Sequence, residues 1–229
     1  MSFYILSNEL WFPPVTEALE DGFLAMGADL SRERLLLAYT QGIFPWYEGP
    51  TPMWWAPDPR FVLFPDALKV SKSMKTVLRN GRFSFSMNRD FGAVISGCQK
   101  AARAGQDSTW INEDVIRGYT ALYEQGYALS AEALEDGQLV GGLYGVLLGN
   151  VFFGESMFSL KSNASKFAFI KLVEILKENG IQLIDCQSHT DHLESLGARM
   201  IPRKQFMSML HQQIPPLDKL QPRQLNWAH

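Results

Sequence analysis

Two carboxylates follow apolar runs that have the character of buried strands. Glu155 comes after Val151–Phe153, Asp185 comes after Leu183–Ile184, and Gln187 lies two residues further on. An unpaired carboxylate inside a sheet is costly or has a shifted pKa. Because side chains alternate along a strand, Asp185 and Gln187 point to one face and can form a polar pair beside Glu155. Such a group could bind an amine or move a proton; the alternative, two strand ends that reach water, is equally compatible with the residues.

The histidines and serines give weaker indications of chemistry. His189 and His192 flank Thr190 and Asp191, which indicate the start of a helix, so we expect both histidines on a surface turn. The chain has no HExxH motif and no cysteine–histidine set, and we therefore expect no metal site. Ser156 lies in GES and not in a G-x-S-x-G motif, so a serine nucleophile is not expected.

A second group of residues suggests contact with nucleic acid. Residues 67–89 carry six basic side chains and no acid, and Lys72, Lys75 and Arg79 fall on one stripe of a predicted helix. Such a stripe is usually a solvated helix face, but it can also contact a phosphate backbone. Trp46 and Trp110 could each stack on a base, which contributes about 1–3 kcal/mol. Together with the acidic pair, these residues suggest a protein that holds an RNA end and does chemistry beside it.

Composition narrows the class of protein. The 229 residues, of which 46% are hydrophobic and 20% charged, suffice for one large domain or an ordinary domain plus a small one. A net charge of −3 argues against a protein that coats nucleic acid with its whole surface. Cys98 and Cys186 lie far apart, which fits a reducing compartment. Without a signal-peptide pattern or a membrane-length apolar stretch, the sequence predicts a soluble cytoplasmic protein.

The segment 42–60 concentrates three tryptophans and five prolines. Proline removes a backbone donor and fixes φ, so we expect neither a helix nor a central strand here. A rigid loop could present Trp46 as a stacking surface. The alternative is a hydrophobic plug at a seam between domains, which the segment alone slightly favours.

The elements that position these residues follow from hydrophobic periodicity and turn signals. We expect a domain boundary near residue 64, with a small N-terminal domain (1–64) and a larger C-terminal domain (65–229). The expected helices are 31–42, 71–81, 90–103, 112–126 and 163–179, and the expected strands are 61–64, 83–87, 127–134, 138–149, 151–158 and 181–186. An antiparallel meander, then a helix, then a strand is an α+β arrangement that resembles the acetyltransferase-type core.

The loop before the helix at 163–179 bears on the cofactor. Acetyltransferases hold the pyrophosphate of coenzyme A with a glycine-containing loop that leads into a helix N-terminus. The corresponding segment here is SLKSNASKF, and no glycine occurs between Gly154 and Gly180. We therefore expect no phosphate cradle and no nucleotide-thioester donor.

Several long motifs occur in a characteristic order between Gly22 and Arg203: GIFPWY, MWWAPDPR, TWI, GGLYG, GESMFS, NASK and LIDCQ. Together they strongly resemble the bacterial leucyl/phenylalanyl-tRNA–protein transferase family. The resemblance implies transfer of Leu or Phe, and less readily Met, from aminoacyl-tRNA to the N-terminal Arg or Lys of proteins, which marks them for N-terminal-rule degradation. It also implies a small N-terminal domain, an acetyltransferase-like C-terminal domain, no metal and no coenzyme; we expect a monomer. Two other classes stay open, a cell-wall-peptide aminoacyltransferase and a non-catalytic protein that binds the aminoacyl-tRNA end.

The resemblance also implies roles for single residues. Trp46 and Trp110 match residues that flank the terminal adenosine. Other positions match polar site residues, namely Tyr39, Glu155, Asp185 and Gln187. A pocket for the transferred side chain would be formed by Phe152, Met157, Leu172, Leu176 and Ile184.

Departures from the family pattern and the expected mechanism complete the prediction. Leu172 and Leu176 stand where phenylalanine is expected, which suggests a wider pocket, and Leu129 stands where a histidine is expected. On this interpretation Asp185, oriented with Gln187, polarises the attacking amine or accepts its proton. Glu155 holds the cationic end of the acceptor, and the basic stripe contacts tRNA. Trp54 and Trp55 anchor the proline-rich loop against the second domain.

Overall fold

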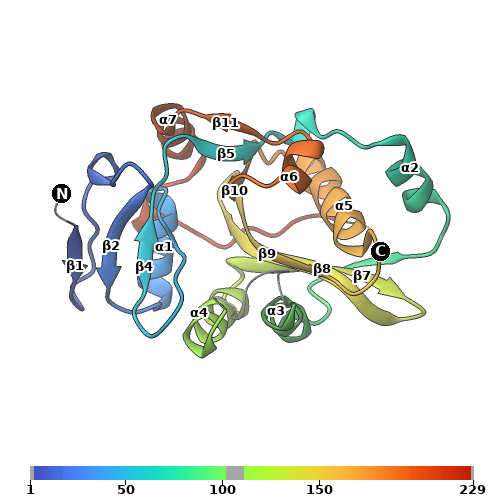
Figure 1. Cartoon of the computed structure of the whole chain (residues 1–229), viewed down its shortest axis with the longest axis horizontal. Helices are drawn as coiled ribbons and strands as arrows, with labels where there is room; N and C mark the ends of the chain where they lie inside the picture. Colours follow the sequence, from blue (N-terminus) through green and yellow to red (C-terminus); the bar gives the residue numbers. More distant parts are fainter. Residues whose placement is uncertain (1–2, 102–110, 228–229) are drawn as a thin grey trace.

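The computed structural model describes residues 3–101 and 111–227, which form two β-sheets and the helices around them (Figure 1). The first sheet has four strands in the spatial order β1-β2-β4-β3. Strand β1 runs parallel to β2, and β4 pairs antiparallel with both β2 and β3. The strands are β1 (Tyr4–Leu6), β2 (Phe23–Gly27), β3 (Phe44–Pro45) and β4 (Met53–Trp55), with helix α1 (Arg32–Thr40) between β2 and β3.

The second sheet has seven strands in the order β11-β5-β10-β9-β8-β7-β6. Its strands are β5 (Arg60–Leu63), β6 (Ser84–Met87), β7 (Ala128–Glu135), β8 (Gln138–Leu148), β9 (Val151–Ser159), β10 (Leu183–Gln187) and β11 (Arg199–Ile201). Strands β6 to β9 are antiparallel, and β10 then joins β9 in parallel. The predicted α+β order of meander, helix and strand is thus confirmed. Strand β5 precedes the predicted boundary at residue 64, yet it pairs with β10 and β11.

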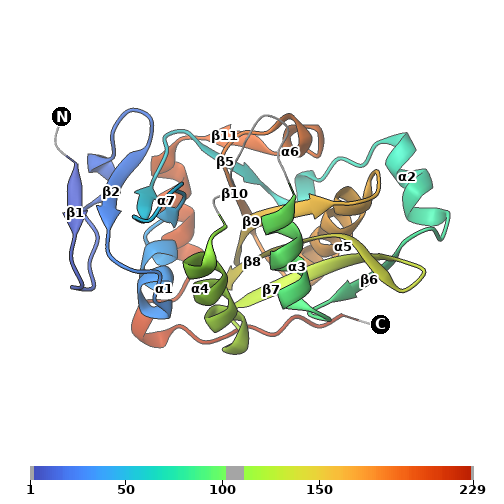
Figure 2. The ribbon, with the colours of Figure 1, turned by 60° about the horizontal axis from the view of Figure 1, so that its bottom comes forward.

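Helices cover both faces of the second sheet (Figures 1 and 2). Helices α3 (Phe91–Lys100) and α4 (Glu113–Glu124) lie on one face, and α5 (Ala164–Glu178) lies on the other with α2 (Lys72–Arg79) beside it. Each face has its own apolar cluster. The C-terminal part adds α6 (Asp191–Ser195) and α7 (Arg203–Gln213), and short 3-10 helices occur at Val15–Glu17, Pro65–Ala67 and Leu217–Lys219.

Side chains cap the starts of helices α3 and α4. The Asn112 side chain accepts hydrogen bonds from the N–H groups of Asp114 and Val115 at the start of α4. Asp90 caps α3 in the same way, because its carboxylate accepts the N–H of Ala93. Each cap satisfies N–H groups that the first helical turn leaves without intrahelical partners.

The proline-rich segment differs from the prediction. Strand β4 lies between β2 and β3, so the expectation that 42–60 contains no central strand is wrong. The physical reason is the placement of the prolines: Pro52 and Pro57 flank the strand, while Pro45 lies in the edge strand β3. Met53–Trp55 therefore keep the N–H groups that a central strand needs.

Trp54 and Trp55 of this segment belong to the first sheet and pack against other residues of the N-terminal region. Trp54 is fully buried, its Nε1 donates to the carbonyl of Gly27 at 3.0 Å, and its ring meets the edge of Phe12. Trp55 packs against Phe23 and Trp46. These contacts of Trp54 and Trp55 lie within the N-terminal region, in contrast to the predicted anchoring against the second domain.

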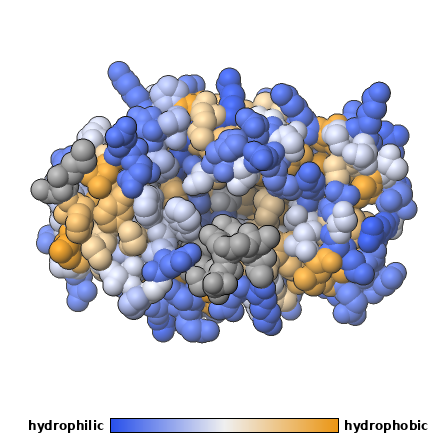
Figure 3. Space-filling model, in the orientation of Figure 1, coloured by the Kyte–Doolittle hydropathy of each residue, from blue (hydrophilic) through white to orange (hydrophobic). Residues whose placement is uncertain are grey.

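Exposed apolar side chains gather at the N-terminal end of the molecule. Phe3, Ile5 and Leu10 are exposed, and Figure 3 shows apolar residues over the end of the molecule that β1 and β2 occupy. Across residues 3–101 and 111–227, no helix combines the length and the apolar character needed to cross a membrane.

The different burial of two tryptophans gives a stability prediction. Trp54→Ala should lower the free energy of unfolding by about 3–5 kcal/mol, because it removes a fully buried side chain. Trp46→Ala should cost less than about 1 kcal/mol, since Trp46 is 41% exposed. Urea unfolding of both variants measures the difference, and an equal loss would show that Trp46 is also a core residue.

Candidate active site

Glu155 lies at an irregularity of strand β9. The register pairs Tyr144 with Ser156 and Gly145 with Gly154, so Glu155 is the extra residue of a β-bulge. A bulge bends the strand locally and redirects a side chain. Here the bulged residue is Glu155, which is only 9% exposed and whose carboxylate is surrounded by hydrogen-bond donors from other elements.

Three side chains donate hydrogen bonds to the Glu155 carboxylate. The Tyr39 hydroxyl from α1 donates to Oε1 at 2.6 Å, and Nε2 of Gln187 from β10 donates to the same oxygen at 2.8 Å. The Tyr119 hydroxyl from α4 donates to Oε2 at 2.8 Å. The two hydroxyls are themselves 2.5 Å apart. The carboxylate thus joins α1, α4, β9 and β10 at one point.

Burial dominates the electrostatics of this cluster. Removal from water raises the pKa of Glu155 to about 7, and the nearby charge of Asp185 acts in the same direction, whereas the three hydrogen bonds oppose it. Burial and the charge of Glu155 also raise the pKa of Tyr39 and of Tyr119, so both phenols keep their protons. Near neutral pH, Glu155 therefore exists in both protonation states, as a group that accepts and releases a proton must.

Asp185 lies in a buried ion pair with Arg60. Its Oδ1 and Oδ2 accept hydrogen bonds from Nε and Nη2 of Arg60 at 2.8 and 2.6 Å, and both side chains are at most 1% exposed. Oδ1 also accepts the backbone N–H of Gln187 at 3.0 Å. The guanidinium lies over the rings of Phe44 and Phe206. These contacts hold the Asp185 carboxylate between the Arg60 guanidinium and the backbone of Gln187.

Two members of the site were missed by sequence reasoning. Arg60 is 125 residues from Asp185 along the chain, and only the pairing of β5 with β10 brings them together. The sequence feature that could have identified Arg60 is its place at the end of the motif MWWAPDPR. Tyr119 is a buried residue of α4, where periodicity indicates burial but not the partner of the hydroxyl.

The residues predicted to form an apolar pocket share one cluster. Phe152, Leu172, Leu176 and Ile184 belong to the core beneath α5, together with Leu129, and Met157 packs against it. The first four are 0% exposed, so in this structure they form core and not the wall of an open pocket.

Trp46 and the basic stripe, both predicted to contact RNA, lie apart from each other. Trp46 is partly exposed beside β3, and Trp110 lies outside the described residues. Lys72, Lys75 and Arg79 are exposed on α2. Helix α2 and strand β4 lie toward opposite ends of the long axis in Figure 1.

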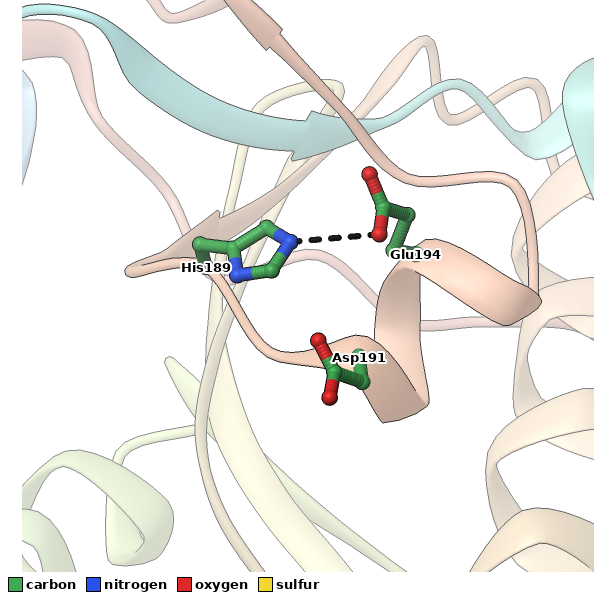
Figure 4. A group of neighbouring side chains, drawn as sticks. All are labelled: His189, Asp191 and Glu194. Carbon is green, nitrogen blue, oxygen red and sulfur yellow. Dashed lines mark ion pairs between the residues drawn. The ribbon is translucent and has the colours of Figure 1, made fainter.

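A group of possible metal ligands lies before and within α6 (Figure 4). The Nε2 atom of His189 is 3.3 Å from Glu194, Asp191 lies close by, and all three residues are exposed. The exposure of His189 agrees with the predicted surface turn, whereas His192 is half-buried. A solvated ion pair accounts for this arrangement, since charged side chains at a surface commonly pair without an ion.

The segment before α5 has no glycine, but one of its residues takes a backbone conformation typical of glycine. Asn163 is left-handed, with φ +70°. Residues from this segment and His192 line a cavity of about 280 Å³.

Comparisons with known proteins give a consistent result. The family model described as leucyl/phenylalanyl-tRNA protein transferase matches residues 62–211, and the model of its N-terminal domain matches residues 28–58. A leucyl/phenylalanyl-tRNA–protein transferase of Syntrophobacter fumaroxidans is 54% identical over 216 residues, which cover 94% of this chain and 92% of that protein. Proteins of the same name from Flavobacterium johnsoniae and Pseudomonas putida are 55% and 48% identical, over 90% and 98% of this chain and 98% of each relative.

Solved structures are more distant. A GCN5-related N-acetyltransferase from Kribbella flavida has a TM-score of 0.39 at 11% identity and covers 73% of this chain and 59% of its own. The structure of L-PGS from Bacillus licheniformis has a TM-score of 0.36 at 14% identity, with 75% and 57% covered.

The buried ion pair gives a prediction about stability. Asp185→Asn should lower the free energy of unfolding by about 3–5 kcal/mol, because it leaves the Arg60 charge buried without its partner. Asp66→Asn is the matched control, since Asp66 pairs with Lys177 at the surface, where such a pair contributes about 0–1 kcal/mol. Urea unfolding at neutral pH measures both, and a loss in Asp185→Asn no larger than in the control would contradict a structural role for the pair.

Proposed function

The chain belongs to the leucyl/phenylalanyl-tRNA protein transferase family, and we propose that it transfers Leu or Phe from aminoacyl-tRNA to the N-terminal Arg or Lys of a protein. Support comes from relatives that are about half identical over nine-tenths of the chain. The modified protein then enters N-terminal-rule degradation in the cytoplasm. The observation that carries the mechanism is the buried Glu155, whose pKa is raised to about 7 among three hydrogen-bond donors.

The chemistry of the aminoacyl-tRNA determines what the protein must contribute to the reaction. An aminoacyl ester is already activated, so the reaction needs no ATP and its barrier consists mainly of positioning and proton transfer. Holding the ester and the amine side by side can lower the barrier by roughly 7–11 kcal/mol. The attacking α-amine has an ordinary pKa of about 7.7–8.0 and must lose a proton before it attacks.

Gln187 is the residue best placed to orient that amine. Its backbone N–H is bound by Asp185 and its Nε2 by Glu155, and φ at this residue is +61°. The carboxamide is partly exposed, and its oxygen has no hydrogen-bond partner in the described part of the chain. This oxygen can accept a hydrogen bond from the amine and direct the nitrogen lone pair toward the ester carbonyl.

Glu155 is the proton acceptor in this mechanism. The carboxylate takes one proton from the ammonium group, and the neutral nitrogen attacks the ester carbon. As the amide bond forms, the bond from that carbon to the ribose oxygen breaks, and the ribose oxygen gains the second proton of the amine. Tyr39 and Tyr119 hold the carboxylate in place and keep their own protons.

These roles differ from the sequence-based assignment. Asp185, saturated by Arg60 and the N–H of Gln187, positions Gln187 and does not accept the proton itself. Glu155, whose pKa is raised to about 7, serves the proton and not the cationic end of the acceptor. For the tRNA, we keep the proposal that Trp46 stacks on the terminal adenosine, which its exposure supports. The exposed stripe of Lys72, Lys75 and Arg79 on α2 supports contact with the backbone.

A transfer assay tests the proposal and the role of Glu155 together. Labelled Phe-tRNA should label a protein that begins with Arg, and Glu155→Gln should lower the rate by a factor of about 10²–10⁴. Because the active form is the carboxylate, the wild-type rate should rise with pH through about 7, and this inflection should be absent in the variant. Glu174→Gln, on the surface of α5, is the matched control and should behave as wild type.

Three results would contradict this account. Label found only in a cell-wall peptide precursor would indicate the alternative aminoacyltransferase. Binding of Phe-tRNA without amide formation would indicate a protein that only holds the tRNA end. Unchanged single-turnover transfer by Glu155→Gln would remove Glu155 from the proton transfer.

A further inference from the structure

The cavity before helix α5 is not used by the mechanism above. It has a volume of about 280 Å³ and is lined by the end of β9, the loop 160–163, the first turn of α5 and one residue of α6. Asn163, Ser165 and Lys166 of the motif NASK are among the lining residues, and this motif has no role in the proposed proton transfer.

The chemistry of the cavity suits an anion. Lys161 and Lys166 line it, and none of its lining residues is acidic. Helix α5 is 15 residues long, and Asn163 at its N-cap makes no side-chain hydrogen bond to the first turn. The positive end of the helix dipole thus faces the cavity, which favours a negative charge there.

Two polar side chains lining the cavity have no hydrogen-bond partner. Ser165 is only 9% exposed, and its hydroxyl makes no hydrogen bond within residues 3–101 and 111–227. His192 also lines the cavity, and its Nε2 is shielded from water without a partner in the same part of the chain. The Ser165 hydroxyl is thus free to donate to a ligand in the cavity, whereas the Nε2 of His192, which is shielded from water, does not open onto it.

The position of the cavity connects it to the site at Glu155. Strands β9 and β10 pair only as far as Phe153 and Asp185, and beyond that point they separate. Ser159 from β9 and His192 from α6 line the cavity on the two sides of this opening. Glu155 and Ser159 are four residues apart on β9, which corresponds to about 13 Å along the strand. Helix α2, with its basic stripe, packs beside α5.

We propose that this cavity binds a backbone phosphate from the single-stranded 3′ end of the donor tRNA. The hydroxyl of Ser165, the first turn of α5 and the charge of Lys166 hold the phosphate, and the nucleoside that follows it extends through the opening toward Glu155. The inference rests on the proposed function for the identity of the nucleic acid. The basic, acid-free lining and the unpartnered hydroxyl of Ser165 support the anion site independently.

Binding of the trinucleotide CCA and of adenosine alone tests this proposal without any transfer step. Calorimetric titration should show that the wild type binds CCA more tightly than adenosine. Ser165→Ala and Lys166→Gln should each reduce this preference by roughly tenfold. Lys166→Gln should also reduce the slope of log affinity against log salt by about 0.7, the value for one phosphate contact on a single strand.

Lys177→Gln is the matched control, because Lys177 lies at the other end of α5 and pairs with Asp66. It should keep the preference for CCA. Thermal unfolding shows that each variant is folded before the titration.

The outcomes separate this proposal from the proposed function. An unchanged preference for CCA in both cavity variants would overturn it, as would a wild type that binds adenosine as tightly as CCA. Inorganic phosphate that binds as tightly as CCA would point to a free anion and would also overturn the tRNA assignment. A wild type that shows the cavity-dependent preference but transfers no amino acid would refute the proposed function and support the phosphate site.

Discussion

The burial of one carboxylate is the constraint on which the site depends. Glu155 is placed by a bulge in β9 and surrounded by donors from α1, α4 and β10, so its charge is tolerated only if those elements stay together. Because its folded pKa is raised, folding favours the neutral form. The corresponding stability is fully present below the ordinary pKa of about 4.3 and is lost as the pH rises through about 7. The free-energy cost of burying the charged carboxylate raises its pKa, and this raised pKa allows Glu155 to exchange a proton near neutral pH.

The ion pair of Arg60 and Asp185 links the site at Glu155 to the rest of the molecule. Arg60 begins β5, pairs with Asp185 on β10, and lies over Phe44 of the first sheet and Phe206 of α7. The N-terminal sheet, the second sheet and a C-terminal helix therefore meet at one guanidinium. Asp185 in turn holds the backbone of Gln187, so an interaction at the seam between the sheets sets the orientation of the residue proposed to face the amine.

Local patterns in the sequence were enough to predict the main elements and half of the site. Alternation and apolar runs located β9 and β10, and strand ends placed Glu155, Asp185 and Gln187 close together. Partners distant in sequence could not be found in this way, because Arg60 reaches Asp185 only through sheet pairing. Strand β4 was missed because prolines surround it, although Met53–Trp55 are three residues whose N–H groups are available for strand pairing. The left-handed turn before α5 was not predicted, because Asn163 and not glycine supplies it.

Direct titration of Glu155 tests the central claim, that burial brings this carboxylate close to neutrality. Infrared difference spectra of the carboxyl stretch, wild type minus Glu155→Gln, recorded between pH 4 and 9, isolate the protonation of this one group. The account predicts a midpoint at about 7. A midpoint near the ordinary glutamate value of about 4.3 would contradict it, because Glu155 would then be a permanent charge at neutral pH and not a proton acceptor.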